Sequence, residues 1–169
     1  ASVTHGTTMC PIPAFSPKKG LNCINKEHIT AFHGVPTMFI AMLEHDDFPK
    51  TDFSYMRTGI MAGSPCPVKV MEDVIEKMHM SEICITYGQT EASPGCTMSK
   101  TTDSIEDRVN TVGGAMFGVE CRIVDPETNE ELPDNVDGEF VARGYNIMKG
   151  YYKMPEATAA AIDENGWLH

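Results

Sequence analysis

Short apolar runs alternate with amphipathic segments over the first part of the chain. The runs at 29–32, 57–63 and 83–87 are bounded by glycine or polar residues, which is typical of buried strands. Residues 37–44 are apolar on every side and residues 67–79 carry their apolar side chains on one stripe, so both segments are expected to be helices. This alternation predicts βαβ crossovers and therefore a mostly parallel sheet with flanking helices.

The N-terminal part carries weaker signals. Ser16 followed by Pro17 predicts a helix start, because a hydroxyl suits the N-cap and proline suits the first helical position. The helix is expected to reach about Lys26, although Gly20 weakens it. Before it, residues 1–13 mix isolated apolar residues with short polar ones, which predicts a poor strand running into a turn.

The texture of the sequence changes near residue 100. Residues 100–110 are polar, and apolar and polar residues then alternate over 119–125 before a second strand pattern at 138–143. The turn-rich segment 126–137 is typical of a hairpin connection, and Pro155 opens a last short helix.

These patterns predict an α/β fold in two parts. We expect residues 1–99 to form an α/β subdomain around the mostly parallel sheet, and residues 100–169 to form a small, antiparallel, β-barrel-like unit.

Composition and charge narrow the class of protein. The chain has 169 residues, of which 41% are hydrophobic and 22% charged, so wholesale disorder is excluded. Its formal charge of −11 leaves no broad positive surface for nucleic acid. No apolar stretch approaches the roughly 18 residues that a membrane span needs. The six cysteines are well separated and include no CxxC pair, so reduced thiols are favoured over a zinc site. Reduced thiols in turn favour an intracellular location, in the cytoplasm or the mitochondrial matrix.

The sharpest group of polar residues directly follows the strand at 83–87. It offers an aromatic ring at Tyr87, a glycine at Gly88, an amide at Gln89, a hydroxyl at Thr90 and a carboxylate at Glu91. Ligands usually bind at the carboxyl ends of parallel strands, and hard oxygens suit a magnesium-bound phosphate. The spacing alone leaves open the alternative of a strand end that enters an ordinary polar turn.

A second group joins a predicted strand to a predicted helix. Gly63, Ser64, Pro65 and Cys66 are small, so their backbone amides can face a ligand, and the N-terminus of a helix favours an anion. Taken alone, this group is better explained as an ordinary proline-initiated helix.

The two groups belong to a larger pattern that resembles the AMP-binding, adenylate-forming enzymes. The resemblance is to acyl-CoA synthetases of the medium- or long-chain fatty-acid-activating type, more than to amino-acid-adenylating members. It covers essentially the whole chain and rests on segments 58–65, 87–91, 138–144, 148–152 and 166–169, whose sequences are TGIMAGSP, YGQTE, GEFVARG, MKGYY and GWLH.

The resemblance implies a two-step ligase that uses ATP, Mg²⁺ and coenzyme A. A fatty carboxylate attacks the α-phosphate of ATP, and the acyl-adenylate is then transferred to the thiol of coenzyme A. By similarity, Tyr87 would pack on the adenine, Thr90 would meet the phosphate and Glu91 would hold the metal. Gly63, Ser64, Pro65, Cys66, Gly88 and Gln89 would border the nucleotide.

The resemblance also implies an acyl pocket. Acetate-activating relatives carry a tryptophan at the place of Gly88, so glycine there leaves room for a medium or long acyl chain. His33 and Gly34, which precede the apolar helix, are expected to wall the pocket.

The family's phosphate loop, ribose-binding aspartate and C-terminal lysine have no counterpart in this sequence. We therefore expect an internal fragment of a longer synthetase that has no ligase activity alone. Cut sheet edges favour some association between copies as a homo-oligomer. The alternative is a natural non-catalytic domain that binds nucleotide or another protein.

Overall fold

The structure is a computed structural model that describes residues 2–169. The chain folds into two compact units: unit 1 comprises Ala1–Cys84 and Thr101–Asn110, and unit 2 comprises Ile85–Lys100 and Thr111–His169. The chain passes from the first to the second within strand β3 (Glu82–Tyr87). The subdomain boundary expected near residue 100 stays a prediction.

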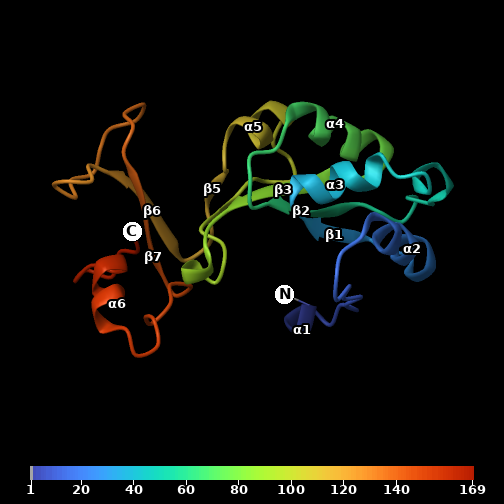
Figure 1. The fold of residues 1–169 in the computed structure, drawn as a ribbon. Helices are drawn as coiled ribbons and strands as arrows, with labels where there is room; N and C mark the ends of the chain where they lie inside the picture. Colours follow the sequence, from blue (N-terminus) through green and yellow to red (C-terminus); the bar gives the residue numbers. More distant parts are fainter. Residues whose placement is uncertain (1) are drawn as a thin grey trace. The chain divides into compact units, whose positions relative to one another are not determined.

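Unit 1 contains the parallel part of the sheet. Strand β1 (Ala31–Gly34) runs parallel to β2 (Thr58–Ala62), with Ala31 opposite Thr58 and Gly34 opposite Met61. The five-stranded sheet has the order β1-β2-β3-β4-β5, where β4 is Thr97–Met98 and β5 is Gly114–Ala115. Figure 1 labels β1 and β2 next to each other. The predicted α/β class with flanking helices is confirmed.

Four helices of unit 1 form a continuous row. They are α2 (Pro17–Glu27), α3 (Pro36–Leu43), α4 (Val68–Lys77) and α5 (Ile105–Asn110), and each touches the next in this order. The first begins as predicted, since the Ser16 hydroxyl accepts a hydrogen bond from the Lys19 amide at 3.2 Å. Gly20 is buried in this helix, where an added Cβ would lie 3.0 Å from Sδ of Met42, so the glycine lets α2 approach α3 closely.

Methionine dominates the core of unit 1. The side chains of Met42, Met61, Met71, Met78 and Met80 are all fully buried, together with Phe39, Val74 and Ile83. Methionine is flexible enough to fill irregular gaps, so this core packs with few of the branched residues that usually fill the space beside a parallel sheet.

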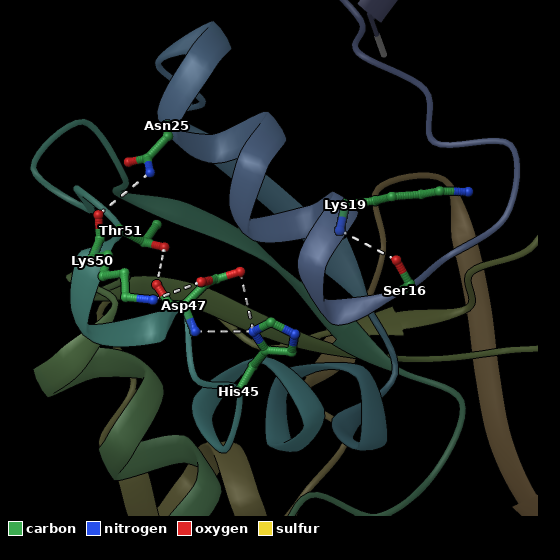
Figure 2. A network of polar contacts seen from close by, with 7 residues as sticks. All are labelled: Ser16, Lys19, Asn25, His45, Asp47, Lys50 and Thr51. Atoms are coloured by element: carbon green, nitrogen blue, oxygen red, sulfur yellow. Dashed lines mark hydrogen bonds and ion pairs between the residues drawn. The ribbon is translucent and has the colours of Figure 1, made fainter.

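A polar network fastens the loop after α3 (Figure 2). The Asp47 carboxylate accepts a hydrogen bond from Nζ of Lys50 at 3.0 Å, which lowers the pKa of Asp47. The Asp47 amide donates to Nδ1 of His45, and the Thr51 hydroxyl donates to the Asp47 carbonyl. Asn25 of α2 accepts from the Asp52 amide at 2.7 Å, which ties the loop to that helix.

The N-terminal segment differs from the prediction. Residues Ser2–His5 form the short helix α1, and Gly6–Phe15 contain no strand, so the predicted strand within 1–13 is wrong for the residues that the structure describes. Residues 3–9 are exposed, so a strand there would have no face to bury.

The polar segment 100–110 also contains a helix that its composition did not predict. Helix α5 begins after Ser104, whose hydroxyl accepts a hydrogen bond from the Asp107 amide at 3.0 Å and donates to the Asp107 carboxylate. This arrangement resembles a capping box, and the Ser-x-x-Asp spacing was its signal in the sequence.

Unit 2 is antiparallel. Strand β4 (Thr97–Met98) pairs with β3 and with β5 (Gly114–Ala115), while β6 (Val119–Val124) pairs with β7 (Glu139–Gly144) in a separate two-stranded sheet. The predicted hairpin is confirmed. Helix α6 (Pro155–Ala161) follows, and Leu168 then pairs with Ala142 of β7. Over residues 2–169, no helix is long and apolar enough to cross a membrane.

One buried cation holds the start of β3 in place within unit 1. Arg108 of α5 is only 5% exposed. Its guanidinium donates to the carbonyls of Ser81 and Ile83, both at 3.0 Å, and to that of Thr101 at 2.5 Å. The bond to Ile83 is buried and the other two are partly buried, so Arg108 supplies donors to carbonyls that are wholly or partly shielded from water.

We expect Arg108→Ala to destabilise the chain by about 3 kcal/mol, because three carbonyls would lose a charged donor. Urea unfolding followed by circular dichroism would measure this change. Glu106→Ala, at an exposed position on the same helix, is the control and should change stability by less than about 0.5 kcal/mol. Equal effects of the two substitutions would contradict the structural role of Arg108.

Candidate functional site

The segment Tyr87–Glu91 leaves the end of β3 in unit 2, as the sequence predicts. After Gly88 and Gln89 it enters a single 3₁₀ turn, η2 (Thr90–Ala92), in which the Ala92 amide donates to the Gln89 carbonyl at 2.9 Å. The residues from Tyr87 to Thr90 are exposed and Glu91 is half-buried. The segment therefore presents its side chains at the carboxyl end of β3 rather than inside a continuous helix.

Tyr87 offers an aromatic face. Its side chain is 43% exposed, and its ring packs edge-on against Phe140 of β7, with the centroids 4.9 Å apart and an interplanar angle of 79°. Contact with Phe140 restrains the Tyr87 ring, while the exposed part of the Tyr87 ring stays available for stacking.

Gly88 is required by the backbone of its own loop. A Cβ atom built there would overlap the carbonyl oxygen of Pro94 and lie 2.9 Å from Cα of Gly95. Any other residue at this position would need the segment 94–95 to move. This constraint is separate from the acyl-pocket role implied by the resemblance, which stays a prediction.

Glu91 is held from two directions. The hydroxyl of Tyr151 donates a hydrogen bond to Oε1 of Glu91 at 2.7 Å, and the Met148 amide donates to the Glu91 carbonyl at 2.7 Å. The bond from Tyr151 lowers the pKa of Glu91 and raises the pKa of Tyr151. The carboxylate is therefore ionised at neutral pH.

Asn146 supports the same loop. It is 8% exposed, and its amide nitrogen donates to the carbonyls of Ala92 at 3.0 Å and Gly95 at 2.9 Å. Sequence patterns did not single out Asn146, Met148 or Tyr151 as functional. Their signal was position, because they lie in or beside the Met-Lys-Gly-Tyr-Tyr block at 148–152.

The oxygen donors near Glu91 suit a metal that is shared with a ligand. Among residues 2–169 there is no group of three or more histidine, cysteine or carboxylate side chains that could form a metal cage. Glu91 and Thr90 provide one ionised carboxylate and one hydroxyl. Magnesium is usually bound through one or two carboxylates together with substrate phosphates, so this sparse, hard donor set fits Mg²⁺ delivered with a nucleotide.

Gly63, Ser64, Pro65 and Cys66 lie in unit 1 between β2 and α4. The first three are exposed, and Gly63 has a φ of +88°. Helix α4 starts after Pro67 without a side-chain cap. The backbone before this helix is exposed, and its contact with a ligand stays a prediction.

The Cys66 side chain does not face that opening. It is 8% exposed, and its thiol donates to Sδ of Met61 at 3.1 Å. Burial raises the pKa of Cys66 to about 11. Only the backbone of Cys66 is therefore available to a ligand.

The two residues assigned to the acyl pocket lie at the end of β1 in unit 1. His33 is exposed, and Gly34 is half-buried beside Met38, whose Sδ would lie 3.2 Å from an added Cβ. His33 stands opposite Ile60 of β2, so it belongs to strand β1.

A cavity of about 340 Å³ occurs elsewhere in unit 2 and involves none of the predicted site residues. Its walls include Arg122, Arg143, Trp167 and His169. Both guanidinium groups lie over the Trp167 ring, at 4.5 and 4.6 Å from its centroid, and Arg143 also binds Glu120 through both carboxylate oxygens at 3.0 Å. These contacts fasten the C-terminal segment to the β6–β7 hairpin.

Comparison with known proteins identifies the family. The family model described as "AMP-binding enzyme" matches residues 1–152 of the chain. The chain belongs to the AMP-binding enzyme family. Residues 1–152 contain both the Tyr87–Glu91 turn and the Tyr151 that binds it.

Curated relatives of this AMP-binding chain include acyl-CoA synthetases and ligases. A putative acyl-CoA synthetase, YngI, of Bacillus subtilis is 51% identical over 168 residues, which are 99% of this chain and 31% of the relative. The mitochondrial medium-chain acyl-CoA ligase ACSF2 of Mus musculus is 39% identical over 98% of this chain and 27% of its own length. The chain thus spans about a third or less of these relatives.

Solved structures of AMP-binding enzymes share the fold. ATP-bound MatB from Rhodopseudomonas palustris matches 99% of this chain and 32% of its own, with a TM-score of 0.82 and 29% identity. The N-terminal domain of FACL13 from Mycobacterium tuberculosis matches 99% of this chain and 40% of its own, with a TM-score of 0.86 and 25% identity.

We expect Gly88→Ala to destabilise the chain by about 2 kcal/mol, because the added methyl group would force the segment 94–95 away. Gly114→Ala is the matched control, since an added Cβ there meets nothing within 4 Å. Thermal unfolding of both variants measures the difference. Equal stability of the two variants would contradict the close approach at Gly88.

The raised pKa of Cys66 predicts a pH-dependent contribution to stability. The folded chain keeps the thiol proton up to about pH 11, whereas the unfolded chain loses it near the ordinary value of 9.0. The stability difference between the native chain and Cys66→Ala is therefore present in full below pH 9 and lost as the pH rises through 11. Urea unfolding at several pH values tests this, and a constant difference would contradict it.

Proposed function

We propose that this chain is part of the nucleotide-binding region of a fatty acid–CoA ligase. The observation that carries the proposal is the Tyr87–Glu91 turn, which presents an aromatic ring, a hydroxyl and an oriented, ionised carboxylate at the end of β3. Membership of the AMP-binding family and the names of its relatives support this assignment.

The proposed reaction has two steps. An oxygen of the fatty carboxylate attacks the α-phosphorus of ATP, and the bond to the bridging oxygen breaks as pyrophosphate leaves. The thiolate of coenzyme A then attacks the acyl carbonyl carbon, and AMP leaves. The first step brings two anions together, so it depends on positioning and on neutralisation of charge.

The residues of this chain would perform the binding part of that chemistry. Tyr87 of unit 2 would stack on the adenine. The backbone of Ser64, Pro65 and Cys66 is the contribution that unit 1 would make to nucleotide binding. Thr90 donates its hydroxyl proton to a phosphate oxygen. Glu91, with Thr90, would hold Mg²⁺, which supplies positive charge that offsets the phosphates.

The proposed acyl substrate is a medium or long chain. Each buried methylene contributes about 0.8 kcal/mol, so an apolar pocket favours such acids over acetate. His33, Gly34 and the apolar helix α3 are the proposed walls, and the relative ACSF2 is named as a medium-chain ligase.

We expect the isolated chain to lack ligase activity, because it spans only 31% and 27% of two relatives that are named as synthetase or ligase. Acyl-CoA formation from octanoate, ATP and coenzyme A by the purified chain would contradict this expectation. If calorimetry shows that the chain binds Mg-ATP while the full-length protein has no ligase activity, the function is that of a non-catalytic nucleotide-binding domain instead.

The proposed function is tested in the full-length protein that contains this segment. Octanoate-dependent exchange of pyrophosphate into ATP should occur, and Glu91→Gln should reduce its rate about a hundredfold because a charged group at the phosphates is lost. Glu106→Gln, which removes an exposed carboxylate on α5, serves as the control and should retain the rate. Full activity of Glu91→Gln would contradict the role of Glu91.

A further inference from the structure

The contact between Tyr151 and Glu91 joins two segments that are sixty residues apart in sequence. The Tyr151 hydroxyl donates to Oε1 of Glu91 at 2.7 Å, which is a short distance typical of a charge-assisted hydrogen bond. Tyr151 is 37% exposed, so its ring lies at the surface of unit 2 rather than in the core. Packing of the ring in a core therefore does not account for its position.

The backbone of Tyr151 is itself fixed. Its amide donates to the hydroxyl of Thr158 at 2.9 Å, and that hydroxyl donates to the carbonyl of Met154, also at 2.9 Å. Gly150 precedes it with a φ of +141°, and an added Cβ would lie 2.7 Å from Cγ2 of Thr158. Helix α6 thus holds the base of Tyr151 while the hydroxyl reaches Glu91.

The backbone of Glu91 is fixed from the same segment. The Met148 amide donates to the Glu91 carbonyl at 2.7 Å, and Asn146 binds the carbonyls of Ala92 and Gly95. The main chain of Glu91 is therefore held without any help from Tyr151. The bond from Tyr151 adds only one thing, which is the orientation of the carboxylate.

Orientation matters for a carboxylate that binds a metal. A glutamate loses side-chain entropy when it is held in one rotamer, and a donor that restrains it beforehand reduces that cost at the moment of binding. Hydrogen-bond partners of metal-binding carboxylates commonly act in this way. Because Tyr151 bonds to Oε1, the second carboxylate oxygen, Oε2, is the one that this hydroxyl does not occupy.

We propose that Tyr151 is a positioning residue that orients the Glu91 carboxylate so that its other oxygen faces the metal ion of a bound metal–nucleotide complex. This inference rests on the proposed function. It assigns Tyr151, within the Met-Lys-Gly-Tyr-Tyr block at 148–152, a role in metal affinity, acting through Glu91 and without contact to the nucleotide.

The test measures metal binding directly in the full-length protein. Manganese replaces magnesium as a paramagnetic probe, and its affinity is measured by electron paramagnetic resonance with a non-hydrolysable α,β-methylene analogue of ATP. Tyr151→Phe keeps the ring and removes only the hydroxyl. We expect it to weaken manganese binding about tenfold, while metal-free binding of AMP and the unfolding temperature stay unchanged.

Three further variants make the outcome decisive. Tyr152→Phe removes the neighbouring hydroxyl from a side chain that is 85% exposed, and it should leave manganese affinity unchanged. Glu91→Gln should weaken manganese binding more than Tyr151→Phe does. Thr158→Val, which releases the Tyr151 amide, should cause a smaller loss in the same direction, and it decides the question if Tyr151→Phe does not fold.

Equal manganese affinity in Tyr151→Phe and Tyr152→Phe would overturn the inference and leave the proposed function intact. A parallel loss of metal-free AMP binding in Tyr151→Phe would overturn it too, because Tyr151 would then support the loop as a whole. Unchanged manganese affinity in Glu91→Gln would instead remove the role of Glu91, and the inference with it.

Discussion

The loop that follows β3 depends on hydrogen bonds donated by a distant segment. The backbone of Gly88 packs so closely against the backbone of Pro94 and Gly95 that no side chain fits between the two segments of the loop. Asn146 and the Met148 amide donate to the carbonyls of Glu91, Ala92 and Gly95 in this loop. A buried carbonyl without a donor destabilises the fold, so these bonds stabilise the loop conformation that exposes Tyr87–Glu91.

Unit 1 meets the same constraint in the same way. There Arg108 donates to the carbonyls of Ser81 and Ile83, at the beginning of β3. In each unit a buried polar side chain from later in the sequence satisfies carbonyls beside this strand. Within the described part of the chain, the Oδ1 atom of Asn146 and the Nε atom of Arg108 have no hydrogen-bond partner, so the hydrogen bonds of both side chains run through their other atoms.

The spacing of apolar residues predicted the longer helices and strands, because burial of one face makes apolar residues recur with the period of the helix or strand. The helices α3 and α4 and the strand β3 lie where apolar spacing placed them. Strands β4 and β5 have two residues each, too short for any period, and α1 has no apolar face to reveal it. At the site, the residue types of Tyr87–Glu91 predicted a turn after a buried strand, and η2 lies there, while their binding roles stay predictions. The partnership of Glu91 with Tyr151 was not predicted, since it arises only when the chain folds.

Gly88 illustrates how one residue can satisfy two independent demands. The resemblance to acyl-CoA synthetases explains the glycine by an acyl chain that needs room, whereas the loop explains it by a carbonyl that leaves no room for Cβ. A bulky residue there would displace the Pro94–Gly95 backbone before it could narrow a pocket. In an enzyme that carries Gly88→Trp, displacement of this loop alone would therefore reduce activity on octanoate and on acetate equally, and the substitution would not reveal the size of the acyl pocket. Chain-length preference is better tested at Met38 on α3, whose side chain covers Gly34 with a flexible thioether and constrains no backbone.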